Sequence, residues 1–272
     1  MSSWLGKSEK IALVVLDGCS LAQWHTVQQG LGEQSNWKFE VRSCFSWLPS
    51  LTNISRQAIF SGQKPLYFPK TIARTDAEPK LWKNYWLDQG ISSQQIGYCK
   101  SVQGSADLER VFDLCDTGHD ILGIVVDEVD KIMHGQHQGE LGMQQQIRNW
   151  MQEGALQKLI TGLFDRNYEV LITADHGNIE ALGMGRPAEG VLADKKGERV
   201  RMYSKEALMA PVLAEYPNTR AWKVPGLPQD SYTIFPTDRT SFGPKGESMV
   251  CHGGISLEEM TIPLVRITRG LT

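Results

Sequence analysis

The segment LITADHGNIEALG (Leu171–Gly183) begins as an apolar, β-branched run and then changes to an aspartate, a histidine and a glycine. A strand points successive side chains to opposite faces, so Asp175 and His176 cannot both face an apolar layer. The strand therefore ends before them, and Gly177 lets the chain turn away. An acid and an imidazole at the end of a buried strand indicate a site that needs both groups.

Two other segments have the same design, an apolar run that ends in an aspartate: Ile11–Leu16, followed by Asp17, and Ile121–Val126, followed by Asp127. Continuous apolar runs are typical of parallel strands buried on both faces. A fourth candidate strand is Met260–Ile267. Helical spacing between the strands, as at Asn53–Phe60 before Gly62, predicts an α/β fold with a parallel sheet.

The segment from about 179 to 250 has a different composition, with many prolines and turn signals such as KKGE and PQD. We interpret it as a cap-like insertion that contains short strands, for example in ERVRMY. No internal repeat and no second full domain is evident. We therefore expect a single domain over residues 1–272, with the cap inserted at about 179–250.

Composition excludes several classes of protein. The chain has 272 residues, 41% hydrophobic and 22% charged, and a net charge of −3, so it has no global basic field that would attract nucleic acid. No apolar run approaches the roughly 18 residues of a membrane span, and no signal-like stretch is evident near residue 1. Five cysteines without paired spacing argue against a disulfide framework. These features predict a cytoplasmic protein without a membrane partner.

Polar residues follow every predicted strand, at the edge of the sheet where α/β proteins bind ligands. The candidates are Asp17; Asp127, Glu128, Asp130 and His134; Asp175 and His176; and His252 ahead of the last strand. Carboxylates and imidazoles together suit zinc, or manganese and other first-row metals. Taken singly, Asp17-Gly18 is better explained as a turn and His134 as a surface residue. The predicted fold, however, brings the whole set to one edge of the sheet. His25 and His119 do not fit that edge, and His137 is better explained as a loop residue.

A nucleophile candidate lies in SWLPSLTNISRQAIFSG. Thr52 precedes the predicted helix Asn53–Phe60, in an N-cap position where backbone N–H groups and the helix dipole favour a phosphate oxygen. Arg56 lies one helical turn later and could bind a second oxygen. The alternative is a plain threonine N-cap with Arg56 on a solvated helix face.

Together these motifs resemble the PglZ domain of the alkaline phosphatase superfamily, which is associated with BREX-type bacterial anti-phage systems. The matching pieces are LDGCSLAQW, LPSLTNISRQAIFSGQKP, VVDEVDKIMHG, ITADHGNIEALGMG, KGERVRMY and CHGGISLEEMTIPLV. The resemblance implies a three-layer α/β/α fold with a mostly parallel central sheet and a small cap. It also implies two divalent metal ions, zinc or alternatively manganese, one near Asp17, Thr52, Asp175 and His176 and the other near Asp130, His134 and His252.

In this resemblance Thr52 takes the place of the nucleophile, and Ser55 stands where the phosphodiesterase branch of the superfamily has an asparagine. The implied activity is a metal-dependent phosphodiesterase that acts on nucleotides or nucleic acid, with other defence-system proteins as partners. Two alternatives stay open, a phosphomonoesterase of the same superfamily and a non-catalytic, metal-stabilised scaffold subunit.

Two sequence features bear on a nucleic-acid substrate. Basic residues of the cap, Lys195, Lys196, Arg199 and Arg201, could hold a polyanionic leaving group, although a solvated basic turn is the favoured explanation for any one of them. Trp82, Tyr85 and Trp86 could stack bases, but their helical spacing favours the core.

Overall fold

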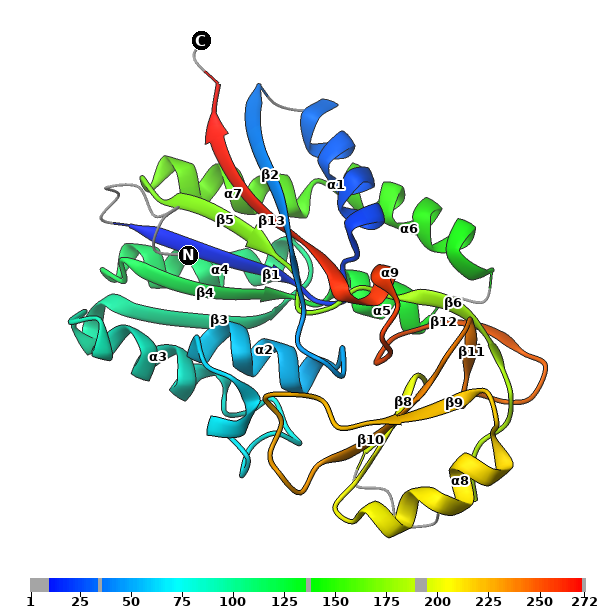
Figure 1. The fold of residues 1–272 in the computed structure, drawn as a ribbon. Coiled ribbons are helices and arrows are strands. Elements are labelled where there is room, and N and C mark those ends of the chain that lie inside the picture. The colour runs from blue at the N-terminus through cyan, green and yellow to red at the C-terminus, as the bar shows by residue number, and fades with distance from the viewer. Residues whose placement is uncertain (1–9, 34–35, 136–137, 189–194, 271–272) are drawn as a thin grey trace.

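The structure, a computed structural model, describes residues 10–33, 36–135, 138–188 and 195–270. Its centre is a six-stranded sheet in the order β2-β13-β5-β1-β4-β3 (Figure 1). The strands are β1 (Ile11–Leu16), β2 (Trp37–Phe45), β3 (Ile96–Val102), β4 (Ile121–Val126), β5 (Glu169–Thr173) and β13 (Thr261–Arg269). Neighbours β5, β1, β4 and β3 are parallel, whereas β13 is antiparallel to both β5 and β2. The predicted α/β fold with a mostly parallel sheet is confirmed.

The direction of β13 explains how a residue that precedes a strand can reach the functional edge. The three predicted apolar runs form β1, β4 and β5, and the fourth forms β13. Because β13 runs antiparallel to β5, its first residues lie beside the carboxyl ends of the parallel strands. His252, which comes shortly before β13, is therefore delivered to the same edge as Asp17 and Asp175.

Helices cover both faces of the sheet, which gives the expected three layers (Figure 1). On one face lie α1 (Leu21–Glu33), α4 (Ser105–Asp116), α5 (Glu128–His134), α6 (Gly139–Glu153) and α7 (Ala155–Asp165); on the other lie α2 (Thr52–Ser61) and α3 (Glu78–Asp88). Alternate residues of β1 pack into the two resulting cores, Val14 into the first and Leu13 into the second. A strand buried on both faces has no polar position, which is why its sequence is continuously apolar.

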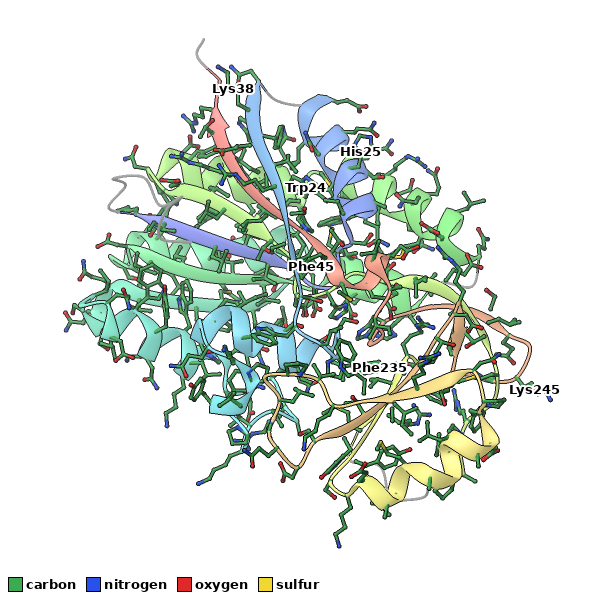
Figure 2. All side chains as sticks on the ribbon, viewed as in Figure 1. Trp24, His25, Lys38, Phe45, Phe235 and Lys245 are labelled. Carbon is green, nitrogen blue, oxygen red and sulfur yellow. The ribbon has the colours of Figure 1, made fainter. Side chains whose placement is uncertain are left out.

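The tryptophans of α3 belong to the core, as their spacing favoured. Trp82 is 1% exposed and Trp86 is 6% exposed, and Trp82 packs edge to face against Phe60 of α2 with ring centroids 5.6 Å apart. They are therefore not available for base stacking. On the other face, Trp24 of α1 is buried while its neighbour His25 lies on the solvent side of the helix (Figure 2).

Residues between β5 and β13 build two further small sheets, in the orders β11-β6-β12 and β7-β8-β10-β9, below the carboxyl ends of the central strands (Figure 1). Their strands are β6 (Ile179–Gly183), β7 (Lys195–Gly197), β8 (Val200–Tyr203), β9 (Thr219–Trp222), β10 (Tyr232–Pro236), β11 (Thr240–Ser241) and β12 (Ser248–Cys251); the helical turns η3 (Glu206–Met209) and α8 (Ala210–Glu215) join β8 to β9. We refer to these two small sheets, together with η3 and α8, as the cap.

The interpretation of the cap arginines as an exposed basic surface is wrong. Arg199 is 2% exposed and Arg201 is 5% exposed. Arg199 is paired with Glu259, and Arg201 donates to backbone carbonyls and lies over the ring of Phe242 at 4.5 Å. Buried guanidinium groups with protein partners cannot receive a polyanion. The side chains of Lys195 and Lys196 lie outside the described part of the structure.

All five cysteines are free thiols, four of them buried, as expected for a chain without a disulfide framework. Within the described ranges, the structure contains no helix with the length and apolar character needed to cross a membrane.

Candidate metal centre

The ends of β1, β4 and β5, together with the segment between β12 and β13, bring six of the predicted ligands into two adjacent clusters. Asp17, Asp175 and His176 form the first; Asp130, His134 and His252 form the second. Within each cluster the potential ligand atoms lie within 4.8 Å of one another. The clusters meet where the rings of His176 and His252 stack, with centroids 3.8 Å apart and an interplanar angle of 4°.

Three oxygen atoms surround Nε2 of His176, two from the carboxylates of the first cluster and one from Thr52. The Thr52 hydroxyl lies 2.9 Å from this nitrogen, Oδ2 of Asp175 lies 3.6 Å from it, and Oδ1 of Asp17 lies 3.9 Å from it. Oxygen and nitrogen ligands at about 2.0 Å from a tetrahedral zinc lie roughly 3.3 Å from one another. The spacing of these donors therefore suits a zinc-sized divalent cation.

The two carboxylates also carry unused ligand atoms. Oδ1 of Asp17 and Oδ2 of Asp175 are buried and have no hydrogen-bond partner among the described residues. The other oxygen of Asp175 is held, because it accepts the N–H groups of Gly18 at 3.0 Å and of His176 at 3.1 Å. Gly18 can make this contact because the tight turn after β1 gives it a positive φ of 71°. The free oxygens thus face the space that a metal would fill.

The electrostatics of the cluster lead to the same conclusion. Burial raises the pKa of Asp175 to about 6, and burial together with the nearby Asp175 raises the pKa of Asp17 well above its ordinary value. Two buried carboxylates side by side repel each other when both are ionised. A divalent cation removes that repulsion, so these residues fit the metal that the fold family implies.

Both histidines present Nε2 to the site in their neutral form. Nδ1 of His176 donates to the carbonyl of Gly177, and Nδ1 of His252 donates to the carbonyl of Ser50, each at 2.9 Å. A carbonyl only accepts hydrogen bonds, so each Nδ1 carries the proton and each Nε2 is left as a donor for a metal. Burial lowers the pKa of His176 to about 4 and that of His252 to about 3, which keeps both rings neutral at pH 7.

The second cluster is more open than the first. Asp130 and His134 lie one turn apart in α5, with Nε2 of His134 3.5 Å from Oδ1 of Asp130. The His134 side chain is 60% exposed, whereas Asp130 is half-buried. Burial and the charge of Asp17 raise the pKa of Asp130 to about 6. An exposed ligand leaves a side of this cluster accessible to substrate or water.

Thr52 is not an N-cap residue, contrary to the prediction. The carbonyl of Leu51 accepts the first hydrogen bonds of α2, from the N–H groups of Ile54 and Ser55, so Leu51 is the N-cap and Thr52 is the first helical residue. The helix starts one residue earlier than its pattern suggested. The Thr52 hydroxyl therefore makes no capping bond and is directed to His176 instead.

Arg56 does not lie on a solvated helix face. Its side chain is buried and is bound by two carboxylates. Its Nη1 donates to Oδ2 of Asp17 at 2.6 Å, and its Nε donates to Oε1 of Glu78 at 2.8 Å. Glu78 is completely buried, and its other oxygen accepts the hydroxyl of Tyr98 at 2.5 Å. The remaining nitrogen, Nη2, makes no hydrogen bond to the described residues.

Sequence reasoning missed three residues that support this site. Glu78 and Tyr98 come from α3 and β3, and nothing in the spacing connects them with Arg56. Asn178 directly follows the Asp-His-Gly motif and could have been noticed. It donates to the carbonyl of Gly18 at 2.8 Å and so braces the turn after β1.

The other polar candidates lie outside the two clusters. Asp127 and Glu128 follow β4 but join neither group of ligands. His119 bonds to the carbonyl of Leu114 ahead of β4, at the opposite end of the sheet. His137 lies outside the described residues.

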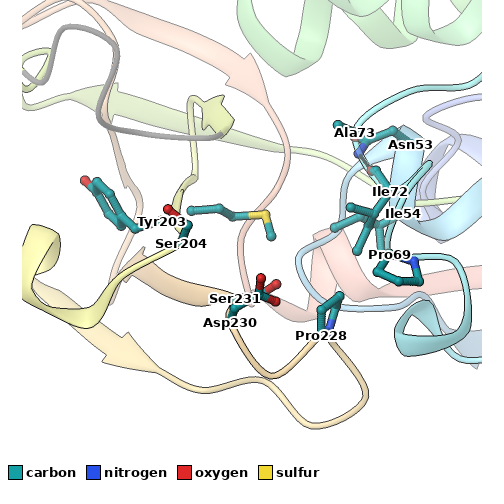
Figure 3. A pocket seen from close by; sticks show the side chains of 11 residues that line it. Asn53, Ile54, Pro69, Ile72, Ala73, Tyr203, Ser204, Pro228, Asp230 and Ser231 are labelled. Atoms are coloured by element: carbon teal, nitrogen blue, oxygen red, sulfur yellow. Dashed lines mark hydrogen bonds between the residues drawn. The ribbon is translucent and has the colours of Figure 1, made fainter.

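A cavity of about 200 Å³ lies between the cap and the start of α2 (Figure 3). One wall includes Asn53 and Ile72, and the facing wall includes Tyr203, Asp230 and Ser231. No residue of either cluster lines it. The cavity is therefore separate from the metal ligands, although Asn53, the residue after Thr52, lines it.

The fold resembles that of solved proteins named as ectonucleotide pyrophosphatase/phosphodiesterase 5. Murine ectonucleotide pyrophosphatase/phosphodiesterase 5 has a TM-score of 0.70 at 13% identity, over 94% of this chain and 87% of that chain. An inactive variant of the murine protein in complex with AMP gives 0.69 at 13% identity, and the human protein gives 0.65 at 12%, both with the same coverage of 94% and 87%. At these identities the likeness shows the fold alone.

No curated protein sequence matches the chain. A family match covers nearly all of it, since residues 2–267 fit the family described as BREX system PglZ alkaline phosphatase-like domain. The chain therefore belongs to the PglZ family of alkaline phosphatase-like domains.

Proposed function

We propose that this chain is a metal-dependent phosphodiesterase that cleaves nucleotides or nucleic acid in bacterial anti-phage defence, with Thr52 as its nucleophile. The observation that carries the proposal is the convergence of the Thr52 hydroxyl with the unpartnered oxygens of Asp17 and Asp175 on Nε2 of His176. A hydroxyl beside candidate metal ligands, at the start of a helix, suits phosphoryl transfer to a side chain, because metal coordination activates a nucleophile and a helix N-terminus binds phosphate oxygens.

The residues fit two divalent ions, zinc or alternatively manganese. Asp17, Thr52, Asp175 and His176 would hold one, and Asp130, His134 and His252 the other. When bound, such ions supply Lewis acidity and neutralise charge on the attacking and leaving oxygens.

In the proposed reaction Thr52 attacks phosphorus in line. Its Oγ1 gives up its proton to solvent and forms the new O–P bond while the bond from phosphorus to the leaving oxygen breaks, and the leaving oxygen takes a proton from solvent. Water then hydrolyses the phosphothreonine, which restores the Thr52 hydroxyl and releases the phosphate product. The N–H groups at the start of α2 carry the positive end of the helix dipole and can bind a non-bridging oxygen. Nη2 of Arg56, which has no partner among the described residues, is the side-chain donor for a second oxygen.

The preference for diesters is supported by the comparisons. The similar murine and human structures are named as pyrophosphatases/phosphodiesterases, and the inactive murine variant, in which a threonine is replaced by alanine, is in complex with AMP. One feature favours a phosphomonoesterase, because a guanidinium beside the site adds positive charge for a phosphate dianion. We also propose that residues 1–272 act as one domain, with the cap at about 179–250 as an insertion in it.

A substrate panel separates these activities. The metal-free protein is assayed with a nitrophenyl nucleotide diester, bis(4-nitrophenyl) phosphate and 4-nitrophenyl phosphate, before and after addition of zinc or manganese. The proposal predicts metal-dependent turnover that is fastest on the diesters and is abolished by a chelator. Faster turnover of the monoester would select the phosphatase, and metal binding without turnover of any ester would favour the scaffold role.

A further inference from the structure

Glu259 has more contacts than its local structure requires. It is a fully buried carboxylate in α9 (Leu257–Met260), the single turn that leads into β13. A capping box with Ser256 accounts for its bond to the Ser256 N–H at 3.2 Å. Beyond the box, Oε1 accepts the Gly254 N–H at 2.7 Å, and the carboxylate faces Nε and Nη2 of Arg199 at 3.3 and 3.2 Å.

The Gly254 contact fixes the loop that carries His252. On its other side the loop is held by Ser50, whose hydroxyl donates to the Gly254 carbonyl at 2.9 Å and accepts the Gly253 N–H at 3.2 Å. The Ser50 carbonyl accepts Nδ1–H of His252. The imidazole is therefore oriented by a loop clamped between Glu259 and Ser50.

The same turn abuts the other histidine. The backbone carbonyl of Glu259 accepts the Gly177 N–H at 2.8 Å, directly after His176. A Cβ on Gly177 would lie only 2.0 Å from the carbonyl oxygen of Glu258, so the approach of the two segments is as close as glycine permits. The backbone of α9 therefore holds the turn after His176, whereas the Glu259 side chain holds only the loop that carries His252.

Arg199 connects this support to the cap. It lies just before β8, and its Nη1 donates to the carbonyl of Asp238, between β10 and β11, and to that of Thr240, the first residue of β11. The guanidinium thus binds cap backbone with one nitrogen and Glu259 with the other two. A buried ion pair stabilises a fold less than apolar residues of the same size would. The Arg199–Glu259 pair is therefore better explained by a role in orienting the cap and α9 relative to each other.

We propose that Arg199 and Glu259 are positioning residues that set His252 as a ligand of the second cluster and tie the cap to the metal centre. The inference rests on the proposed function only in taking His252 as a metal ligand. It gives the motifs KGERVRMY and HGGISLEEM, which belong to different parts of the fold, one shared role.

Zinc binding to the full chain tests the proposal. Metal-free protein is titrated with zinc against a chromogenic zinc indicator, at a temperature where circular dichroism shows every variant folded. Glu259→Gln and Arg199→Met should each weaken one of two zinc sites by about 10–100-fold and leave the other unchanged, as expected for a residue that orients a ligand. The effect should be absent when His252→Ala is already present, because both changes then act on the same site.

The control is Glu169→Gln, which breaks an ion pair with Arg266 of 2.7 Å at the far end of β5. It should lower the melting temperature without changing either zinc affinity. Folded Glu259→Gln protein with both affinities intact, or with both reduced to the same extent, would overturn the positioning role.

A readout without metal or turnover completes the test. Long-range proton–nitrogen NMR of the metal-free wild type should show His252 protonated at Nδ1, and Glu259→Gln should populate both tautomers; an unchanged tautomer would also overturn the proposal. Diester hydrolysis by the same wild-type samples keeps the two hypotheses apart. If the wild type shows no turnover while Glu259→Gln weakens one zinc site selectively, the proposed function alone is contradicted. If the wild type shows turnover while Glu259→Gln leaves zinc binding unchanged, the positioning role alone is contradicted.

Discussion

Replacing Asp175 with asparagine should stabilise the metal-free protein and abolish its stabilisation by zinc. Asp175 is completely buried beside Asp17, and one of its oxygens has no partner among the described residues. An asparagine oxygen can still accept the N–H groups of Gly18 and His176, which now bind Oδ1. The substitution therefore removes a buried charge while it keeps the hydrogen bonds that shape the turn.

The magnitude follows from the pKa. A carboxyl whose folded pKa is raised from 3.8 to about 6 favours the folded protein when protonated, and this stability is lost as pH rises between those values. At pH 8 the ionised carboxylate costs the metal-free fold about 3 kcal/mol, at 1.36 kcal/mol for each pH unit. Asparagine has no such cost, so metal-free Asp175→Asn protein should melt roughly 5–10 °C higher than wild type at pH 8, and at nearly the same temperature near pH 4.

Zinc reverses the order of stability. A ligand at about a thousand times its dissociation constant stabilises a protein by about 4 kcal/mol, which the wild type should gain and Asp175→Asn should largely lose. Thermal unfolding at pH 8, with a chelator and then with zinc, measures both effects. The control is Asp113→Asn, an exposed aspartate of α4. An Asp175→Asn protein that is less stable without metal and is still stabilised by zinc would refute the reasoning.

Three further predictions concern the same site. Zinc affinity should fall about tenfold or more from pH 7 to pH 5, because Asp130 and Asp175 have pKa values raised to about 6 and must lose their protons to bind metal. His176 is neutral at both pH values and adds nothing to the change. Equal zinc affinities at pH 7 and pH 5 would contradict this prediction. Arg56→Lys should lower the free energy of unfolding by about 1.5–3 kcal/mol in urea titrations, since an ammonium cannot bind the carboxylates of Asp17 and Glu78 in the same geometry. An unchanged free energy of unfolding would contradict a stabilising role for these two ion pairs. Gly177→Ala should cost about 1–3 kcal/mol in the same assay, because its Cβ would clash with a carbonyl of α9; a neutral result would show that α9 can move away.

The strand-end ligands were predictable because their signal is local. Asp17 and Asp175 each follow an apolar run that only a doubly covered strand explains, and parallel strands end at one edge. His252 precedes its strand, so its place at that edge depends on the antiparallel direction of β13. The direction of a strand is a property of the whole sheet, which a local pattern does not contain.

The partners of the arginines were not predictable. Arg56 meets Glu78, 22 residues away, and Arg199 meets Glu259, 60 residues away, so no helix or strand period relates either pair. A charged residue in a sequence is normally expected on the surface, and only the packing of distant elements shows that these four are buried. The observed start of α2, at Thr52, is one residue earlier than the predicted start. The sequence does not show this, because Leu51 caps the helix through its backbone carbonyl and not through a side chain.

The most direct test of the central claim compares the wild type with Thr52→Ala in the metal-dependent hydrolysis of bis(4-nitrophenyl) phosphate. Thr268→Ala, at an exposed position near the far end of β13, serves as the matched control, and the zinc content of all three proteins is measured beforehand. If Thr52 is the nucleophile, Thr52→Ala should lose turnover by about a thousandfold or more, equivalent to about 4 kcal/mol of barrier, while Thr268→Ala retains it. Near-normal turnover by folded, zinc-loaded Thr52→Ala protein would contradict the account.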